Sequence, residues 1–249
     1  MHARLTTQLQ RAPETFAAPT LRLLDGFELR HRGAVIAVPM TAQRLLAFLA
    51  LQSRPVQRVY VAGSLWLDSD ETHANASLRS ALWRAQRLRC NLVATTATHL
   101  SLAPHIDTDV SDGTLLARDL IRRSSPPTPA EVDAICALGD LLPDWYDEWL
   151  DVERERLRQL RLHALDAACR RLARARRFSE AVEVGLVAVA AEPLRESAHR
   201  ALIEAHVAEG NRGEAARQLE AYRRLTSEVG VEPSPELQRL VALRLGPRR

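Results

Sequence analysis

The stretch from Thr72 to Arg89, THANASLRSALWRAQRLR, constrains the fold more than any other part of the chain. At 3.6 residues per turn, its apolar side chains fall on one stripe that can pack onto a small core, made of Leu78, Ala81, Leu82, Ala85 and Leu88. The opposite face is small, polar and rich in arginine, and no acidic residue lies within the stretch. The pattern predicts one long amphipathic helix with a basic free face.

This free face carries residue types that suit contact with DNA. Arginine can donate to two guanine acceptors at once, and small residues let a helix approach the bases closely. The helix residues that we expect to contact DNA are His73, Asn75, Arg79, Ser80, Trp83, Arg84 and Arg87. An ordinary solvated helix face remains an alternative, because all 34 basic residues are arginine, a bias typical of a GC-rich genome.

Short predicted elements on either side of this helix define a domain. In chain order they are strands at 21–24, 27–30 and 35–38, a helix capped by Thr41, a short helix at 59–65, then, after the long helix, a hairpin of 91–96 and 98–103 with a strand at 106–110 beside it. Three helices followed by a hairpin make a winged helix-turn-helix, whose third helix enters the major groove. The first half therefore predicts an α+β winged-helix domain.

The tip of the predicted hairpin is polar. Thr96, Thr98 and His99 offer hydroxyl and imidazole groups that suit phosphate or minor-groove contacts. Strand propensity alone would also account for the threonines. We include the three residues among the expected DNA contacts.

A polar, proline-rich segment at 124–129, SSPPTP, marks the domain boundary. Thr128 and Glu131 then form a capping box, with Pro129 at the first helical position. The predicted organisation is a flexible N-terminal arm over residues 1–20, a winged-helix DNA-binding domain over 21–123 and a helical domain over 124–249.

A helical repeat runs through the second half. Ala181 and Ala215 lie 34 residues apart in similar segments, which is the period of the tetratricopeptide repeat. The two repeats would cover about 162–195 and 196–229 and would stack around a concave protein-binding face. A generic antiparallel helical bundle is the alternative. The predicted fold class is an α+β winged helix-turn-helix followed by an all-α tetratricopeptide-like domain.

Two tryptophans precede the repeats. Trp145 and Trp149 are expected on one face of a helix over 141–150, where packing in the core or between domains explains them. A ligand cage is the alternative. A last helix is expected to begin at Pro235, with Ser234 as its cap.

The distribution of charge separates the two halves. Residues 1–124 contain 15 arginines and 10 acidic residues, a net +5, whereas residues 125–249 contain 19 arginines and 21 acidic residues, a net −2. The basic half holds the helix with the arginine face, and the acidic half suits contacts with proteins.

Composition excludes several classes of protein. No run of 18 apolar residues could span a membrane, and the N-terminus lacks the apolar core of a signal peptide. The three cysteines have no CxxC spacing, so neither a disulfide framework nor a zinc site is expected. We expect a protein of a reducing cytoplasm, with no cofactor and no metal. GxSxG, HExxH and Walker sequences are absent, so an enzyme is not expected.

The chain resembles the Streptomyces antibiotic regulatory protein (SARP) family over residues 21 to about 245. The segments that carry the resemblance are LRLLDGFELRHRG (21–33), TAQRLLAFLAL (41–51), LWLDSDETHANASLRSALWRAQRLR (65–89), LLPDWYDEWLDVERERL (141–157) and the most specific, AEPLRESAHRALIEAHVAEGNRGEAARQLEAYRRLTSEVGVEPSPEL (191–237). The chain is similar to the small members, which join an OmpR-like winged helix to a bacterial transcriptional activation domain. It departs from the family's basic pattern at Met40 and at 72–74.

The resemblance implies a transcriptional activator that binds direct repeats in double-stranded promoter DNA and recruits RNA polymerase holoenzyme, including its σ subunit. Two protomers would lie side by side on the DNA, and a gene cluster for a secondary metabolite such as an antibiotic would be the target. A rival interpretation is a tetratricopeptide adaptor whose winged helix binds protein.

Overall fold

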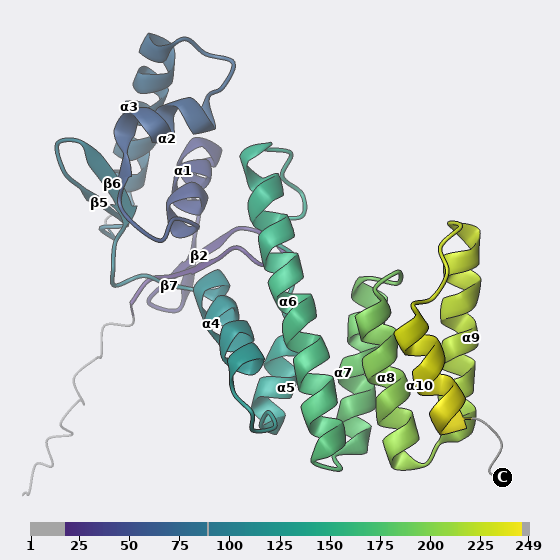
Figure 1. Cartoon of the computed structure of the whole chain (residues 1–249). Coiled ribbons are helices and arrows are strands. Elements are labelled where there is room, and N and C mark those ends of the chain that lie inside the picture. Colours follow the sequence, from purple (N-terminus) through teal and green to yellow (C-terminus); the bar gives the residue numbers. More distant parts are fainter. Residues whose placement is uncertain (1–17, 89, 246–249) are drawn as a thin grey trace, which may run out of the picture. The chain divides into compact units, whose positions relative to one another are not determined.

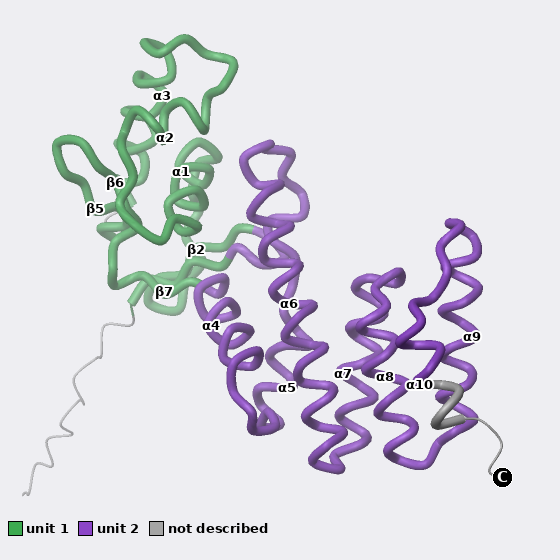
Figure 2. Tube along the Cα trace, in the orientation of Figure 1, with its two compact units in different colours: residues 1–22, 27–108 green, residues 23–26, 109–249 purple. Residues whose placement is uncertain are grey.

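The computed structural model describes residues 18–88 and 90–245, which divide into two compact units (Figures 1 and 2). The first unit comprises the described residues up to Arg22 together with Phe27–Thr108. The second comprises Leu23–Gly26 together with the described residues from Asp109 onward. The turn Leu23–Gly26 joins two strands of the first unit, yet by its contacts it belongs to the second.

The first unit contains a four-stranded sheet in the order β3-β2-β1-β7, whose last strand comes from the end of the unit. The strands are β1 (Thr20–Arg22), β2 (Glu28–His31), β3 (Ala34–Ile36) and β7 (Asp107–Thr108). The expectation that 106–110 pairs beside the hairpin was wrong, because β7 runs parallel to β1, with Leu21 opposite Thr108. Strand β2 occupies only one edge of β1, and β7 completes the other edge.

Three helices follow the sheet, α1 (Met40–Ala50), α2 (Arg58–Leu65) and α3 (Glu71–Arg87). Both α1 and α2 pack against α3. The second half of helix α1 is buried on all sides; the buried residues of the helix are Ala42, Leu45, Leu46, Ala47, Phe48 and Leu49. These apolar residues provide the small core against which the buried stripe of α3 lies.

The predicted cap of α1 was wrong by two residues. Pro39 is the N-cap, and its carbonyl accepts from the backbone N–H groups of Ala42 and Gln43. Thr41 lies inside the first turn, where its hydroxyl accepts from Nη1 of Arg84 at 2.9 Å. The extended backbone that proline favours starts the helix earlier than the threonine signal indicates.

The hairpin is part of a three-stranded sheet in the order β4-β6-β5. Strands β5 (Val93–Thr95) and β6 (His99–Leu102) form the expected hairpin, and β4 (Val56–Gln57) pairs with the other edge of β6. The order of three helices and a hairpin confirms the predicted winged helix-turn-helix.

The second unit is helical. Its helices are α4 (Asp109–Arg122), α5 (Pro129–Cys136), α6 (Trp149–Arg174), α7 (Phe178–Ala191), α8 (Glu196–Glu209), α9 (Arg212–Glu228) and α10 (Pro235–Leu245). Helix α4 packs on α6 and shares a buried apolar cluster with it. By contacts the division falls between Thr108 and Asp109, before α4, whereas the sequence placed the boundary after this helix at 123/124.

The capping box at the start of α5 is confirmed. Thr128 accepts from the backbone N–H of Glu131, whose carboxylate accepts from the backbone N–H of Thr128 at 2.7 Å. Two nitrogens of Arg123 also donate to this carboxylate, at 2.7 and 2.6 Å. The Arg123 contact, with the Thr128 hydrogen bonds, lowers the pKa of Glu131 to about 2.

The predicted helix over 141–150 was wrong. Trp145 lies in a turn, where its N–H donates to the carbonyl of Leu142, and only Trp149 and Leu150 of this segment belong to a helix, α6. Pro143 and a left-handed backbone at Leu142, with φ of 42°, are unsuited to a continuous helix. The two tryptophans therefore do not share a helical face.

The repeat positions correspond to pairs of antiparallel helices. The C-terminal part of α6 pairs with α7, and α8 pairs with α9; α7 and α8 also pack on each other. Gly185 permits a close approach there, because a Cβ at this position would lie 3.0 Å from Leu202. Ser234 caps α10, as expected. The predicted all-α second domain is confirmed as a fold, whereas its assignment to the tetratricopeptide repeat stays a prediction. No described helix is long and apolar enough to cross a bilayer.

Candidate nucleic-acid interface

Helix α3 starts from a well-defined cap. The carboxylate of Asp70 accepts from the backbone N–H of His73 at 2.9 Å and contacts Nδ1 of the same residue at 2.8 Å. These hydrogen bonds, the backbone one first, lower the pKa of Asp70. The same contacts hold the His73 ring against the start of the helix.

The two faces of α3 differ as the sequence predicts. Its buried residues are Ala74, Leu78, Ala81, Leu82 and Ala85, four of the five members of the predicted stripe among them. Its exposed residues include Ala76, Arg79, Ser80, Trp83, Arg84 and Arg87. The helix is fixed to the core by one face and presents the other to solvent.

Two residues in the middle of the free face are available for hydrogen bonding. Within the described chain, no hydrogen bond or ion pair engages the side chain of Arg79 or Ser80. Nor does a carboxylate pair with any arginine of α3 among the described residues. An arginine fork and a hydroxyl without partners can bind base edges or phosphate oxygens.

Trp83 and Arg87 form a pair on the same face. The guanidinium carbon of Arg87 lies 4.8 Å from the ring centroid of Trp83, which is the geometry of a cation–π contact. The Trp83 residue is 55% exposed, although a large aromatic side chain of this kind is usually well covered. The stacked guanidinium is held in place and keeps its edge donors for a ligand.

The other three predicted helix residues already have partners. Arg84 donates to Thr41 on α1, and Nδ2 of Asn75 donates to the carbonyl of Glu71 at 2.8 Å. His73 is engaged by Asp70. Their positions on the exposed side remain compatible with DNA contact, but each must exchange or share an existing hydrogen bond.

The wing tip is organised by its own side chains. Oγ1 of Thr96 accepts from the backbone N–H of His99 at 2.9 Å, which closes the turn. The hydroxyl of Thr98 lies 2.9 Å from Nδ1 of His99. Thr96 thus serves the turn, while exposed Thr98 and half-buried His99 form a polar pair that can contact phosphate.

One basic residue near the wing was not among the predicted contacts. Arg58 begins α2, and its backbone N–H donates to the carbonyl of Thr98 at 2.9 Å. Its side chain therefore originates beside the wing tip. The sequence offers no signal for this, because β4 is only two residues long and its pairing with β6 is not local.

The described residues contain no group of three or more histidine, cysteine or acidic side chains able to hold a metal ion. The candidate interface is thus made of side-chain donors on one helix and one hairpin. Its geometry suits recognition of a polyanion.

Residues 136–243 match the family model described as the bacterial transcriptional activator domain. The chain carries a bacterial transcriptional activator domain. The match begins at the last residue of α5 and extends into α10, so the activator domain is formed by the paired helices of the second unit.

The fold as a whole has a counterpart among solved structures. It is similar to Mycobacterium tuberculosis EmbR in a complex with a low-affinity phosphopeptide, with a TM-score of 0.72, 19% identity and 93% of this chain covered. The chain spans 66% of the length of that EmbR chain. No curated protein matches the sequence. The predicted SARP-type architecture, a winged helix followed by the activator domain, is thereby confirmed at the level of domain content and fold.

Proposed function

We propose that this protein is a sequence-specific, DNA-binding transcriptional activator. The observation that carries the proposal is the free face of α3, which combines unpaired Arg79 and Ser80 with the stacked pair of Trp83 and Arg87. This face lies on the third helix of a winged helix-turn-helix, the element that enters the major groove in such folds. The same chain carries an activator domain.

Each part of the interface has a distinct role in this proposal. Arg79 and Ser80 read base edges, and Arg87 contacts guanine or phosphate from its place over Trp83. Arg84, Asn75 and His73 contribute at the margins of the groove. Thr96, Thr98 and His99 place the wing against the backbone of the adjacent groove, where contacts position the protein without reading sequence.

The partners follow the resemblance to the SARP family. Two protomers bind direct repeats near a promoter, each with α3 in a major groove on the same face of the duplex. The activator domain then recruits RNA polymerase holoenzyme through contacts that include σ. We place the target in a gene cluster for a secondary metabolite.

A footprint of the purified protein on the DNA upstream of its own gene tests the proposal. The experiment is run with and without RNA polymerase holoenzyme at two salt concentrations. We expect protection of spaced repeats that strengthens with polymerase and weakens with salt, because each neutralised phosphate contributes about −0.9 to the slope of log K against log salt. No protection at low salt, with another protein still captured, would favour an adaptor in its place.

A further inference from the structure

The helical unit contains a group of hydrogen-bonded residues that we call the clasp. The clasp consists of residues 23–25, 109 and 140–142 together with Arg154. It contains residues at the covalent crossings 22/23 and 108/109 between the two units and lies next to the third crossing, at 26/27. Any molecule bound there would touch the segments through which the winged helix is attached.

Hydrogen bonds from main-chain N–H groups hold the segments of the clasp together. The N–H of Leu142 donates to the carbonyl of Leu23 at 2.9 Å, and the N–H of Asp25 donates to the carbonyl of Asp140 at 2.8 Å. The carboxylate of Asp109, the first residue of α4, accepts from the N–H groups of Leu23 and Leu24 at 2.9 and 3.1 Å. These contacts join the turn to two distant segments of the chain.

Arg154 of α6 completes the clasp by donating hydrogen bonds to backbone carbonyls of the segment that begins at residue 140. Its Nε donates to the carbonyl of Leu141 at 2.9 Å, and its Nη2 donates to the carbonyls of Leu142 and Trp145. The fit around the turn is close, because a Cβ on Gly139 would lie 2.1 Å from the Asp25 carboxylate. Arg154 is thus committed to the protein and is not available to a ligand.

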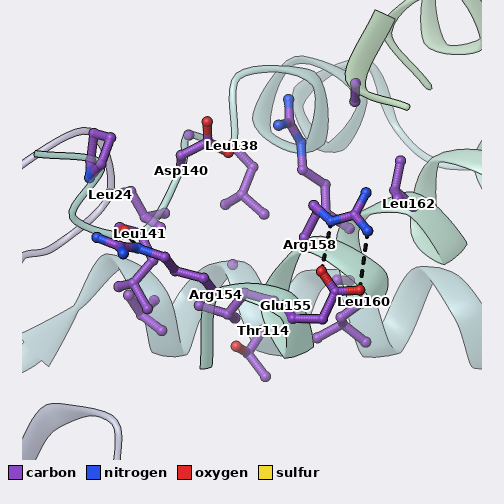
Figure 3. Close-up of a pocket in the computed structure, with 18 of the residues that line it drawn as sticks. Leu24, Thr114, Leu138, Asp140, Leu141, Arg154, Glu155, Arg158, Leu160 and Leu162 are labelled. Atoms are coloured by element: carbon purple, nitrogen blue, oxygen red, sulfur yellow. Dashed lines mark hydrogen bonds and ion pairs between the residues drawn. The ribbon is translucent and has the colours of Figure 1, made fainter. Parts of the chain in front are cut away.

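A cavity of about 630 Å³ opens beside the clasp (Figure 3). It is lined by α4, the 138–143 segment, α6 and the end of α7, and most of its surface is apolar. Leucines supply much of the lining, including Leu24, Leu138, Leu141, Leu160 and Leu162. This volume falls within the range of about 300–1,000 Å³ that small-molecule sites occupy.

The charged side chains of the lining indicate what kind of molecule would fit. Glu155 is paired with Arg158, the contact drawn in Figure 3, and Asp151 is paired with Arg154. Arg161 is half-buried and has no carboxylate partner in the part of the chain that the structure describes; its Nη2 donates only to the carbonyl of Cys136, at 3.0 Å.

We propose that this cavity binds a small apolar carboxylic acid, whose hydrocarbon part covers the leucines and whose carboxylate pairs with Arg161. Burying apolar surface supplies the binding free energy, and the arginine supplies the preference for an anion. Asp140 also lines the cavity, but it is exposed to solvent and so opposes an anion less strongly than half-buried Arg161 attracts it. The bound acid would reinforce the clasp through Leu24 and Leu141.

The test uses the full chain and two probes of equal length, octanoate and its neutral counterpart octan-1-ol. We expect octanoate to raise the melting temperature saturably and to show a heat of binding by calorimetry, with octan-1-ol weaker by at least tenfold. Neither measurement involves DNA, so the outcome is independent of the proposed DNA-binding function. An absence of saturable binding, or equal binding of the two probes, would overturn the proposal.

Matched variants locate the site. Arg161→Gln should weaken octanoate binding about tenfold to a hundredfold, the usual effect of losing a charge-assisted hydrogen bond. Arg170→Gln, on the same helix but outside the cavity, should leave it unchanged. Thr114→Phe on α4 fills the cavity and should abolish binding, whereas Leu115→Phe changes an exposed neighbour and should not.

Hydrogen exchange reports on the clasp itself. With octanoate bound, the amides of Leu23, Leu24 and Leu142 should exchange more slowly, and the same amides should not change in Arg161→Gln. Circular dichroism verifies that each variant is folded, and if Thr114→Phe is not, the pair of arginine variants decides. Equal effects of Arg161→Gln and Arg170→Gln would reject the site.

Discussion

Helices α3 and α6 are both rich in arginine, but they use it differently. In the first half of α6, arginines at 154, 156 and 158 each pair with a carboxylate three residues earlier, at N–O distances of 3.5, 2.8 and 2.9 Å. In α3, no described carboxylate pairs with Arg79, Arg84 or Arg87. In a chain without lysine, the number of arginines therefore does not distinguish a nucleic-acid interface; we propose that an exposed helix face whose arginines all lack an acidic partner does.

The comparison extends to burial, which decides how much a paired arginine contributes to stability. Most pairs of α6 are exposed at the surface, where an ion pair contributes about 0–1 kcal/mol. The pair of Arg195 and Asp166 differs, because the two side chains are only 15% and 3% exposed. Asp166 also accepts from the hydroxyl of Ser197 at 2.7 Å. The pair thereby ties the start of α8 to α6.

The largest effect is expected when this buried pair is broken. Asp166→Ala should lower the free energy of unfolding by about 3–5 kcal/mol, because it leaves the Arg195 guanidinium buried without its counter-charge. The urea midpoint, followed by circular dichroism at unchanged m-value, measures the loss. Asp166→Asn keeps an acceptor for Ser197 and should lose less. A loss below about 1 kcal/mol for the alanine variant would contradict the assignment of this pair as a structural tie.

The second effect concerns an arginine without a partner. Arg79→Ala should weaken binding to the operator by about 1–3 kcal/mol, roughly fivefold to 150-fold, with unchanged stability. Fluorescence anisotropy with the footprinted DNA measures it. If Arg79 reads a base, the preference for that base falls and the slope of log K against log salt stays the same. If Arg79 contacts phosphate, that slope becomes less negative by about 0.9. Unchanged affinity and slope would remove Arg79 from the interface.

The third effect tests a partly buried pair by its pH dependence. The pKa of Glu131 is lowered to about 2, mainly by Arg123, so its ionised form stabilises the fold at neutral pH. This contribution is complete above the unfolded pKa, near 4.5, and is lost as the pH falls from there toward 2. Glu131→Gln should cost about 1–2 kcal/mol at pH 7 and less than about 0.5 kcal/mol near pH 2, where half of the folded-state carboxyl is protonated.

The glutamine variant is chosen because it can still cap α5 through its amide oxygen. It therefore separates the charge of Glu131 from its hydrogen bonds to Thr128. Urea midpoints of the two proteins at several pH values between 2 and 7 give the difference. A difference that does not shrink at low pH would assign the cost to the cap in place of the ion pair with Arg123.

The contrast between α3 and α6 also explains what the sequence could and could not predict. The buried stripe of α3 was predictable because Leu78, Ala81, Leu82 and Ala85 repeat with the helical period. The capping box at Thr128 was predictable because its partner is three residues away. Local pattern was sufficient in both cases.

Contacts between distant segments were not predictable in this way. The hydrogen bond from Arg84 to Thr41 joins residues 43 positions apart, and the pairing of β1 with β7 joins two short strands at opposite ends of the first unit. The clasp depends on Asp109 reaching Leu23, 86 positions away. Such contacts depend on the tertiary arrangement, and single residues such as Asp109 look like ordinary helix caps in the sequence.

The smallest effect is the control on which the comparison depends. Arg156 of α6 has a side chain that is 45% exposed and is paired with Glu153. Arg156→Ala should change the free energy of unfolding by no more than about 0.5 kcal/mol and DNA affinity by less than about twofold. Urea midpoints measure the change in stability, and fluorescence anisotropy measures the change in DNA affinity. If Arg156→Ala weakened DNA binding as much as Arg79→Ala does, general positive charge would explain the affinity, and the lack of an acidic partner would no longer distinguish α3 from α6.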